Sequence, residues 1–304
     1  MFSTGEIIIQ QTVNGLILGC FYALISLGYT MVYGIVRLLN FAHGDVYMVG
    51  AFVGFFIFGA LAAVTGTGWL SIILAMIAAM FLCGVLGFLI QRFAYRPLLD
   101  APRLSLLITA IGVSLVLQNA MMILTNGEFK FFNHSVNPRT GIALGNITIT
   151  WIQLVLLGIT GILLIALTWF VTKTIWGKAM RAISMDRPTC RLMGINVNTI
   201  IGITFFIGSA LAAVAGVMAC VYYGNVHYFM GYIMGMKAFT AAVIGGIGSI
   251  PGAMLGGLLL GLLEAAGTQV LGSSWKDVFA FGILIIMLIF KPTGLLGKTE
   301  VERM

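Results

Sequence analysis

The sequence predicts an all-α integral membrane protein, a polytopic bundle of about eight or nine transmembrane helices that can include broken or re-entrant segments. Of its 304 residues, 60% are hydrophobic and only 8% are charged, whereas soluble domains carry about 25% charged residues. Its mean hydropathy is +1.09. A chain with so few charges cannot cover its own surface in water, but its apolar side chains can face lipid.

Nine apolar runs are candidates for transmembrane helices, each of which takes about 20 residues. They lie near 8–35, 45–64, 69–91, 104–125, 151–172, 198–222, 229–248, 251–271 and 277–290. The first run is long enough to tilt or to break near Gly28. Because only two residues separate the seventh and eighth runs, one or both could be broken or re-entrant. We expect a single transmembrane domain over residues 1–304.

The basic residues predict how the chain is oriented. They cluster around 92–103, in the loop 173–197 and in the C-terminal tail. Since cytoplasmic loops carry an excess of Lys and Arg, a nine-span arrangement places these segments in the cytoplasm and the N-terminus outside. The loop 126–150, rich in Gly and Asn, is then periplasmic. An eight-span arrangement could move the N-terminus. This bias accounts for the net charge of +7 without nucleic-acid binding.

The second basic loop contains signals for a short helix. Ser184 or Asp186 could cap it, with Pro188 in its first turn, and Gly194 suits the position that ends it. We therefore predict a helix over about Arg187–Met193. The composition of the loop 173–197, taken alone, is better explained by an ordinary basic loop on the cytoplasmic side. A plain connector between two spans, however, needs only a few residues. The length and the two signals favour a docking element.

Five polar residues beside or within the predicted spans are candidates for a translocation pathway, because ionisable residues inside a membrane usually face an interior or a cavity. They are Asn40, His43, Asp45, Lys237 and Glu264. Asn40 and Asp45 could equally be caps of the helix that follows them. We expect Asp45 and Lys237 each to be neutralised by a partner, and each is a candidate partner for the other.

Small residues recur at four-residue spacing in the first and eighth runs, which favours close helix packing in a membrane. The glycines concerned are Gly15, Gly19, Gly252, Gly256, Gly257 and Gly261. The run Gly245–Gly248 is not a phosphate loop, because no Gly-Lys-Ser/Thr follows it. The sequence also contains neither Gly-x-Ser-x-Gly nor His-Glu-x-x-His, so a membrane enzyme is disfavoured and no catalytic residue is expected.

Six motifs stand in the order of the branched-chain amino acid permease family of the LivH type, which the chain resembles over nearly its whole length. They are Asn40-Phe-Ala-His-Gly44, Ala94-Tyr-Arg-Pro97, Leu117-Gln-Asn119, Gly235-Met-Lys-Ala-Phe-Thr-Ala-Ala-Val243, Gly245-Gly-Ile-Gly-Ser-Ile-Pro-Gly-Ala253 and Pro292-Thr-Gly294. The resemblance implies a multi-pass permease subunit of a bacterial ABC importer in the cytoplasmic (inner) membrane.

The resemblance implies that the substrate is a branched-chain amino acid. Related importers carry urea, short amides or other amino acids, and these remain the alternative. A stand-alone ion- or proton-coupled transporter would need intramembrane coupling groups and would leave the docking loop without a purpose.

The resemblance also implies the partners. A second permease subunit of the LivM type would complete the pathway, and a periplasmic binding protein would deliver the substrate. Two subunits of the LivG and LivF types would bind and hydrolyse ATP with Mg, so this chain needs no cofactor or metal of its own. Its loop 181–196 resembles the family's coupling loop, which implies coupling roles for Arg181, Asp186, Arg187, Arg191, Leu192 and Gly194.

Overall fold

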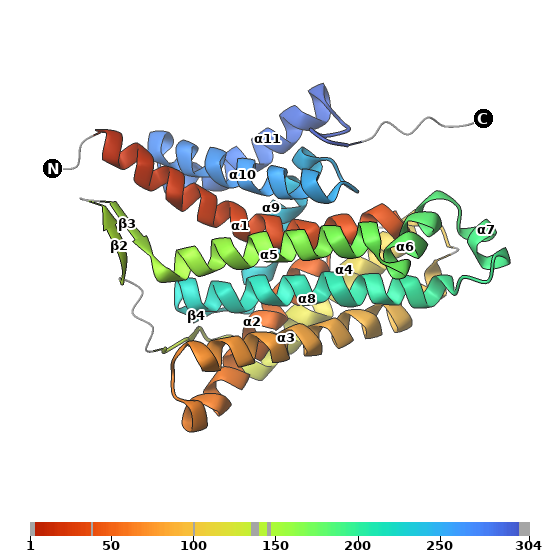
Figure 1. The fold of residues 1–304 in the computed structure, drawn as a ribbon, viewed down its shortest axis with the longest axis horizontal. Helices are drawn as coiled ribbons and strands as arrows, with labels where there is room; N and C mark the ends of the chain where they lie inside the picture. The colour runs from red at the N-terminus through yellow and green to blue at the C-terminus, as the bar shows by residue number, and fades with distance from the viewer. Residues whose placement is uncertain (1–3, 38, 100, 135–139, 145–146, 298–304) are drawn as a thin grey trace.

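The computed structural model describes residues 4–37, 39–99, 101–134, 140–144 and 147–297. The described chain is a bundle of helices (Figure 1). The helices are α1 (Thr4–Val36), α2 (His43–Thr65), α3 (Trp69–Ile90), α4 (Arg103–Thr125), α5 (Trp151–Lys173), α6 (Ile175–Met185), α7 (Arg187–Leu192), α8 (Val197–Tyr223), α9 (Met230–Gly245), α10 (Ile250–Leu271) and α11 (Lys276–Phe290). A π-helical turn (Gln91–Tyr95) and two 3₁₀ turns (Arg96–Leu98 and Ser273–Trp275) join them.

The predicted membrane fold is confirmed. Within the described residues, eight helices are long and apolar enough to cross a bilayer, and the shorter α9 accounts for the remaining predicted run. Most of α1 and α8 is buried at the centre of the bundle, whereas α5 and α11 bury few of their residues. Exposed apolar faces of this kind suit contact with lipid or with another membrane subunit.

Helix α1 continues through Gly28, so the alternative of a break there is wrong. Its 33 residues make it roughly 50 Å long, which exceeds the hydrocarbon thickness of about 30 Å and requires tilt or extension beyond it. Gly28 serves close packing instead, because the ring of His43 occupies the space that a side chain at Gly28 would fill.

Helix α9 is too short to cross a bilayer unless the bilayer thins around it. Its 16 residues span roughly 24 Å, and a turn containing Gly246 and Gly248, with φ of 101° and 95°, leads into α10. The C-terminal tail completes the end of α9: the backbone N–H groups of Leu295 and Leu296 donate to the carbonyls of Ile244 and Gly245, each at 2.9 Å. The tail therefore satisfies carbonyls that a helix end would leave without partners.

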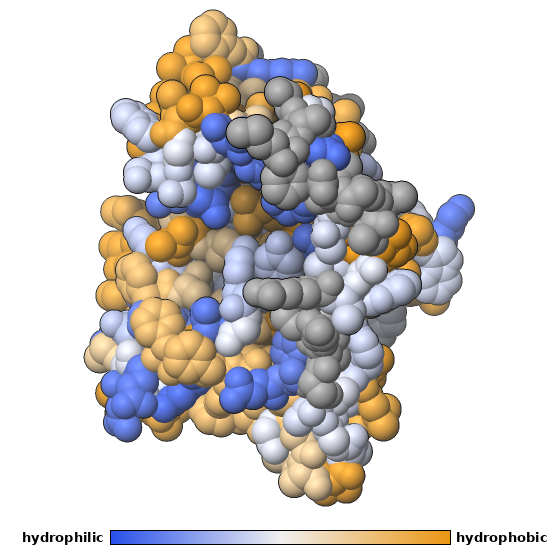
Figure 2. Space-filling view, turned by 90° about the vertical axis from the view of Figure 1, so that its left-hand side faces the viewer, coloured by the Kyte–Doolittle hydropathy of each residue, from blue (hydrophilic) through white to orange (hydrophobic). Residues whose placement is uncertain are grey.

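The two long loops lie at opposite ends of the bundle (Figure 1). At one end, β1 (Lys130–Phe131) pairs with β4 (Asn225–Val226), and β2 (Gly141–Leu144) pairs with β3 (Ile147–Thr150), both antiparallel. The sequence indicated only turns here. Residues 135–139 and 145–146 of this loop lie outside the described residues. Helices α6 and α7 lie at the other end. We call the end of the bundle that carries the four strands the strand end, and the end that carries α6 and α7 the α7 end. Figure 2 shows the strand end, where hydrophilic and hydrophobic side chains are interspersed.

Candidate functional site

The first polar segment leads into α2 within the interior of the bundle. Asn40 and His43 are buried. The Asn40 side-chain oxygen accepts a 2.6 Å hydrogen bond from the hydroxyl of Tyr95, and the His43 ring meets Tyr29 edge-on at 4.8 Å. In the described structure no side chain caps α2. The alternative that Asn40 or Asp45 caps this helix is therefore wrong.

Asp45 is held by neutral side chains of α4. Its carboxylate accepts hydrogen bonds from the Ser114 hydroxyl at 2.5 Å and the Gln118 amide at 3.0 Å, and the Gln118 amide also donates to Ser114 at 3.1 Å. All three side chains are buried. The trio attaches α4, which buries few of its residues, to α2. Nothing in the sequence pairs Asp45 with Ser114 or Gln118, although Gln118 stands in the motif Leu117-Gln-Asn119.

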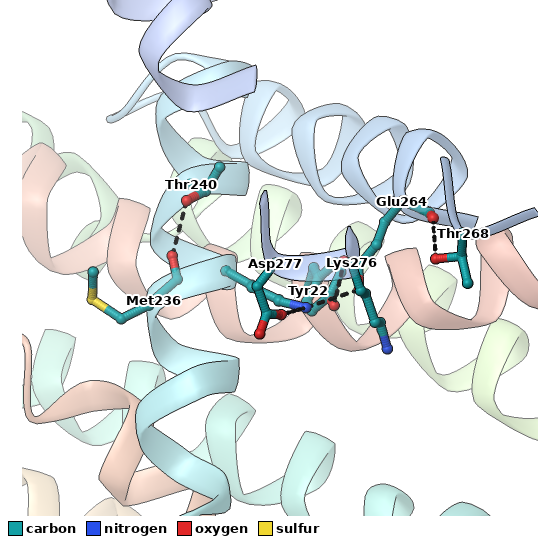
Figure 3. Close-up of polar contacts among 8 residues, drawn as sticks. Tyr22, Met236, Thr240, Glu264, Thr268, Lys276 and Asp277 are labelled. Carbon is teal, nitrogen blue, oxygen red and sulfur yellow. Dashed lines mark hydrogen bonds and ion pairs between the residues drawn. The ribbon is translucent and has the colours of Figure 1, made fainter. Parts of the chain in front are cut away.

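Lys237 and Glu264 meet in a buried charge cluster that joins four helices. Glu264 is fully buried; its Oε1 lies 2.9 Å from the Lys237 Nζ and 3.3 Å from the Lys276 Nζ. Its Oε2 accepts a 2.7 Å hydrogen bond from Tyr22. The Lys237 Nζ also lies 2.7 Å from Asp277 Oδ1. Figure 3 shows the side chains from α1, α10 and α11 converging beside α9.

The expected pairing of Lys237 with Asp45 is wrong. In the described structure Lys237 points to α10 and α11, whereas Asp45 points to α4. Each is neutralised or hydrogen-bonded, but by a different set of partners. The five pathway candidates therefore do not form one site: the Asn40 side chain reaches Tyr95, Asp45 reaches α4 and the His43 ring packs on Tyr29. Among the five, a direct bond between side chains joins Lys237 and Glu264.

The spaced glycines of α10 present two faces to two different helices. Side chains added at Gly257 and Gly261 would collide with the backbone of α1 at Ala23 and Gly19. Those added at Gly252 and Gly256 would collide with the backbone of α9 at Gly245. The second glycine pair is displaced by five residues from the first, which rotates it by about 140° around the helix, and this is why α10 can pack closely on both neighbours.

The short helix of the basic loop is confirmed as α7, which begins at Arg187 as predicted and ends one residue early, at Leu192. Of the two candidate caps, Asp186 is used: its carboxylate accepts from the Thr189 backbone N–H at 3.1 Å. The hydrogen bond from the Thr189 hydroxyl, followed by this backbone bond, lowers the pKa of Asp186. Gly194 has φ of 80°, the left-handed conformation expected after a helix end.

Helix α7 is attached to the bundle on one side and exposed on the other. Arg187 donates a hydrogen bond to the carbonyl of Val36, at the end of α1. Cys190 is buried in the apolar cluster beneath α7. Leu192 and Met193 are 88% and 76% exposed. The loop therefore exposes the apolar side chains of Leu192 and Met193, while Arg187 contacts the end of α1.

Two of the remaining loop candidates differ in their surroundings. Arg181 is exposed and donates hydrogen bonds back to the carbonyls of Val171 and Thr172, near the end of α5. Arg191 lies on the exposed side of α7.

Among the described residues, no group of three or more His, Cys, Asp or Glu side chains is arranged to hold a metal ion.

A family model described as "Branched-chain amino acid transport system / permease component" matches residues 11–288. The chain belongs to this permease family. Over 97% of both chains, the permease is 46% identical to the branched-chain amino acid permease protein BraD of Pseudomonas aeruginosa and 45% identical to LivH of Escherichia coli K12. A probable LivH of Methanocaldococcus jannaschii is 26% identical, over 90% of this chain and 88% of its own. The permease is thus a multi-pass membrane transport component rather than an enzyme.

Proposed function

We propose that this permease is the transmembrane subunit of an ABC importer for branched-chain amino acids in the bacterial cytoplasmic membrane. The observation that carries the proposal is the sequence identity of 46% and 45% to BraD and LivH, in alignments that cover 97% of both chains. Both relatives are named as permeases for high-affinity transport of branched-chain amino acids. We further propose that a second, LivM-type permease completes the pathway, that LivG- and LivF-type subunits bind ATP and Mg, and that a periplasmic protein delivers the amino acid. Uptake of labelled leucine by the reconstituted complex tests this assignment, with urea as the alternative cargo.

The proposed orientation places the α7 end in the cytoplasm and the strand end in the periplasm. We expect an impermeant maleimide to label Phe131→Cys, and not Met185→Cys, in right-side-out membranes, because these exposed residues lie at opposite ends of the bundle. The native cysteines give a low background, since all four are buried. Labelling of Met185→Cys but not of Phe131→Cys would show that the permease has the opposite orientation.

We propose that α7 is the coupling helix, through which closure of the ATP-binding subunits reaches the bundle. Leu192 supplies an exposed apolar contact and Arg191 an exposed charge. Asp186 and Gly194 define the two ends of the helix, Arg187 connects it to α1, and Arg181 connects the preceding helix to α5. This arrangement supports the proposal because a displacement of α7 would be transmitted to the end of α1 through the hydrogen bond between Arg187 and Val36.

Gly194→Val is expected to uncouple ATP hydrolysis from transport. A valine resists φ of 80°, at a strain of about 1–3 kcal/mol. Around Gly194 the described atoms leave open space for the added carbon, so the effect is confined to the backbone at the end of α7. The measurements are leucine uptake and ATPase stimulation by the loaded binding protein. We expect uptake to fall at least tenfold, with normal membrane insertion.

Gly272→Val is the matched control for this strain. Gly272 has φ of 89° and similarly open surroundings among the described residues, but it follows α10 at the strand end. It should retain coupling. A second variant, Leu192→Asp, changes an exposed contact without altering the backbone and should also uncouple the complex. Normal uptake and stimulation in both Gly194→Val and Leu192→Asp would show that the loop is only a connector.

A further inference from the structure

A cavity of about 300 Å³ lies at the strand end, where α2, the end of α8 and the start of α9 meet. Its volume is at the lower end of the range typical of small-molecule sites. Much of its wall is apolar and comes from α9, through Met230, Ile233 and Met234. Its lining includes none of the pathway candidates and none of the residues of the loop 181–196. The cavity therefore has the size and the surface to hold a small, partly apolar molecule.

Tyr47 of α2 lines this cavity and has an unsatisfied polar group. Its side chain is fully buried, and its hydroxyl has no hydrogen-bond partner among the described residues. Buried tyrosine hydroxyls nearly always have a partner. A hydroxyl without one, in a residue that lines a cavity, is a donor that a molecule bound there can use.

The N-terminus of α9 lies at the same cavity. Met230, its first residue, lines the wall, and within the described structure no side chain caps this 16-residue helix. The Met230 N–H donates to the His227 carbonyl at 3.2 Å, while the next N–H groups have no acceptor within the helix. A helix N-terminus with free donors favours an anion, and short membrane helices present such ends to anionic substrate groups.

His227 adds another donor. Its Nδ1 accepts the backbone N–H of Phe229 at 3.3 Å, so the neutral ring carries its proton on Nε2. The ring is held in place by stacking on Phe129, with centroids 4.2 Å apart. The nine residues that line the cavity include no Asp, Glu, Lys or Arg. The cavity thus combines neutral hydrogen-bond donors with an apolar wall.

We propose that this cavity is a transient binding site for the transported amino acid, in which Tyr47, His227 and the N-terminus of α9 hold the carboxylate and Ile233 and Met234 contact the aliphatic side chain. The proposal rests on the proposed function and deepens it. Neutral donors suit a site of passage, because a transported solute must bind well enough to enter and weakly enough to leave.

The test uses the reconstituted complex without binding protein and measures binding of labelled leucine, with leucine and leucinamide as competitors. Leucinamide keeps the side chain and the amine but lacks the carboxylate. We expect leucine to compete at least tenfold better. Tyr47→Phe removes only the unpartnered hydroxyl and should weaken leucine binding about three- to tenfold, the effect of one hydrogen bond. His227→Ala should weaken it similarly, and Tyr232→Phe, on the exposed part of α9, should change nothing.

A second measurement separates this proposal from the assignment of function. In the full system with binding protein, Tyr47→Phe should reduce leucine transported per ATP hydrolysed while the stimulation of ATPase activity persists. If the wild-type complex imports leucine but Tyr47→Phe equals it in binding and transport, or if leucinamide competes as well as leucine, the carboxylate site is wrong and the importer assignment stands. If the wild-type complex imports no leucine, the assignment fails and this proposal fails with it.

Discussion

Replacing Glu264 with alanine is expected to reduce the free energy of unfolding of the permease by about 3–5 kcal/mol, the range for removing one partner of a buried ion pair. The change leaves Lys237, only 3% exposed, with Asp277 alone, and it removes the acceptor of the Tyr22 hydroxyl. Unfolding in mixed detergent micelles measures the loss. Because the cluster joins α1, α9, α10 and α11, we also expect a lower yield of folded protein.

Two variants separate the charge effect from a loss of packing. Lys237→Met combined with Glu264→Leu removes both buried charges and keeps side-chain volume, so the double variant should be more stable than Glu264→Ala. Asp277→Asn alters the member that is 58% exposed and should cost no more than about 1 kcal/mol. A double variant as unstable as Glu264→Ala would contradict a role for the ion pair.

Replacing Gly19 with leucine is expected to abolish folded permease. A carbon added at Gly19 would lie 2.7 Å from the Cα of Leu258 and 3.0 Å from the carbonyl oxygen of Gly257. Both contacts are with the backbone of α10, which cannot move aside as a side chain can. Even Gly19→Ala should cost about 1–3 kcal/mol through overpacking. The measurement is the yield of monodisperse protein after extraction in mild detergent.

The matched control is Gly158, in the middle of α5. A carbon added there meets none of the described atoms within 4 Å, so Gly158→Ala should be neutral or slightly stabilising through its higher helix propensity. Gly158→Leu should still give folded protein. If Gly19→Leu gave the same yield as Gly158→Leu, the close packing of α1 on α10 would be unimportant for folding.

The amino-acid sequence by itself determined where the helices lie and how α7 begins and ends. Apolar length and hydropathy are local properties, so the predicted spans agree with the observed helices within a few residues. The signals for α7 are also local: Asp186 accepts a hydrogen bond from a residue three positions later, and Gly194 adopts the left-handed conformation at its own position. Neither depends on a distant segment.

Only the tertiary structure decided which polar groups meet. Opposite charge suggested a pair between Asp45 and Lys237, but Asp45 contacts Ser114 and Gln118 of α4, and Lys237 contacts Glu264, 27 positions later. The same holds for the glycines of α10, whose small faces were visible in the sequence although the helices they pack against were not. The physical reason is that helices apolar on every side give no periodic signal of which face is buried. Their rotation, and therefore the direction of each polar side chain, is set by packing against neighbours.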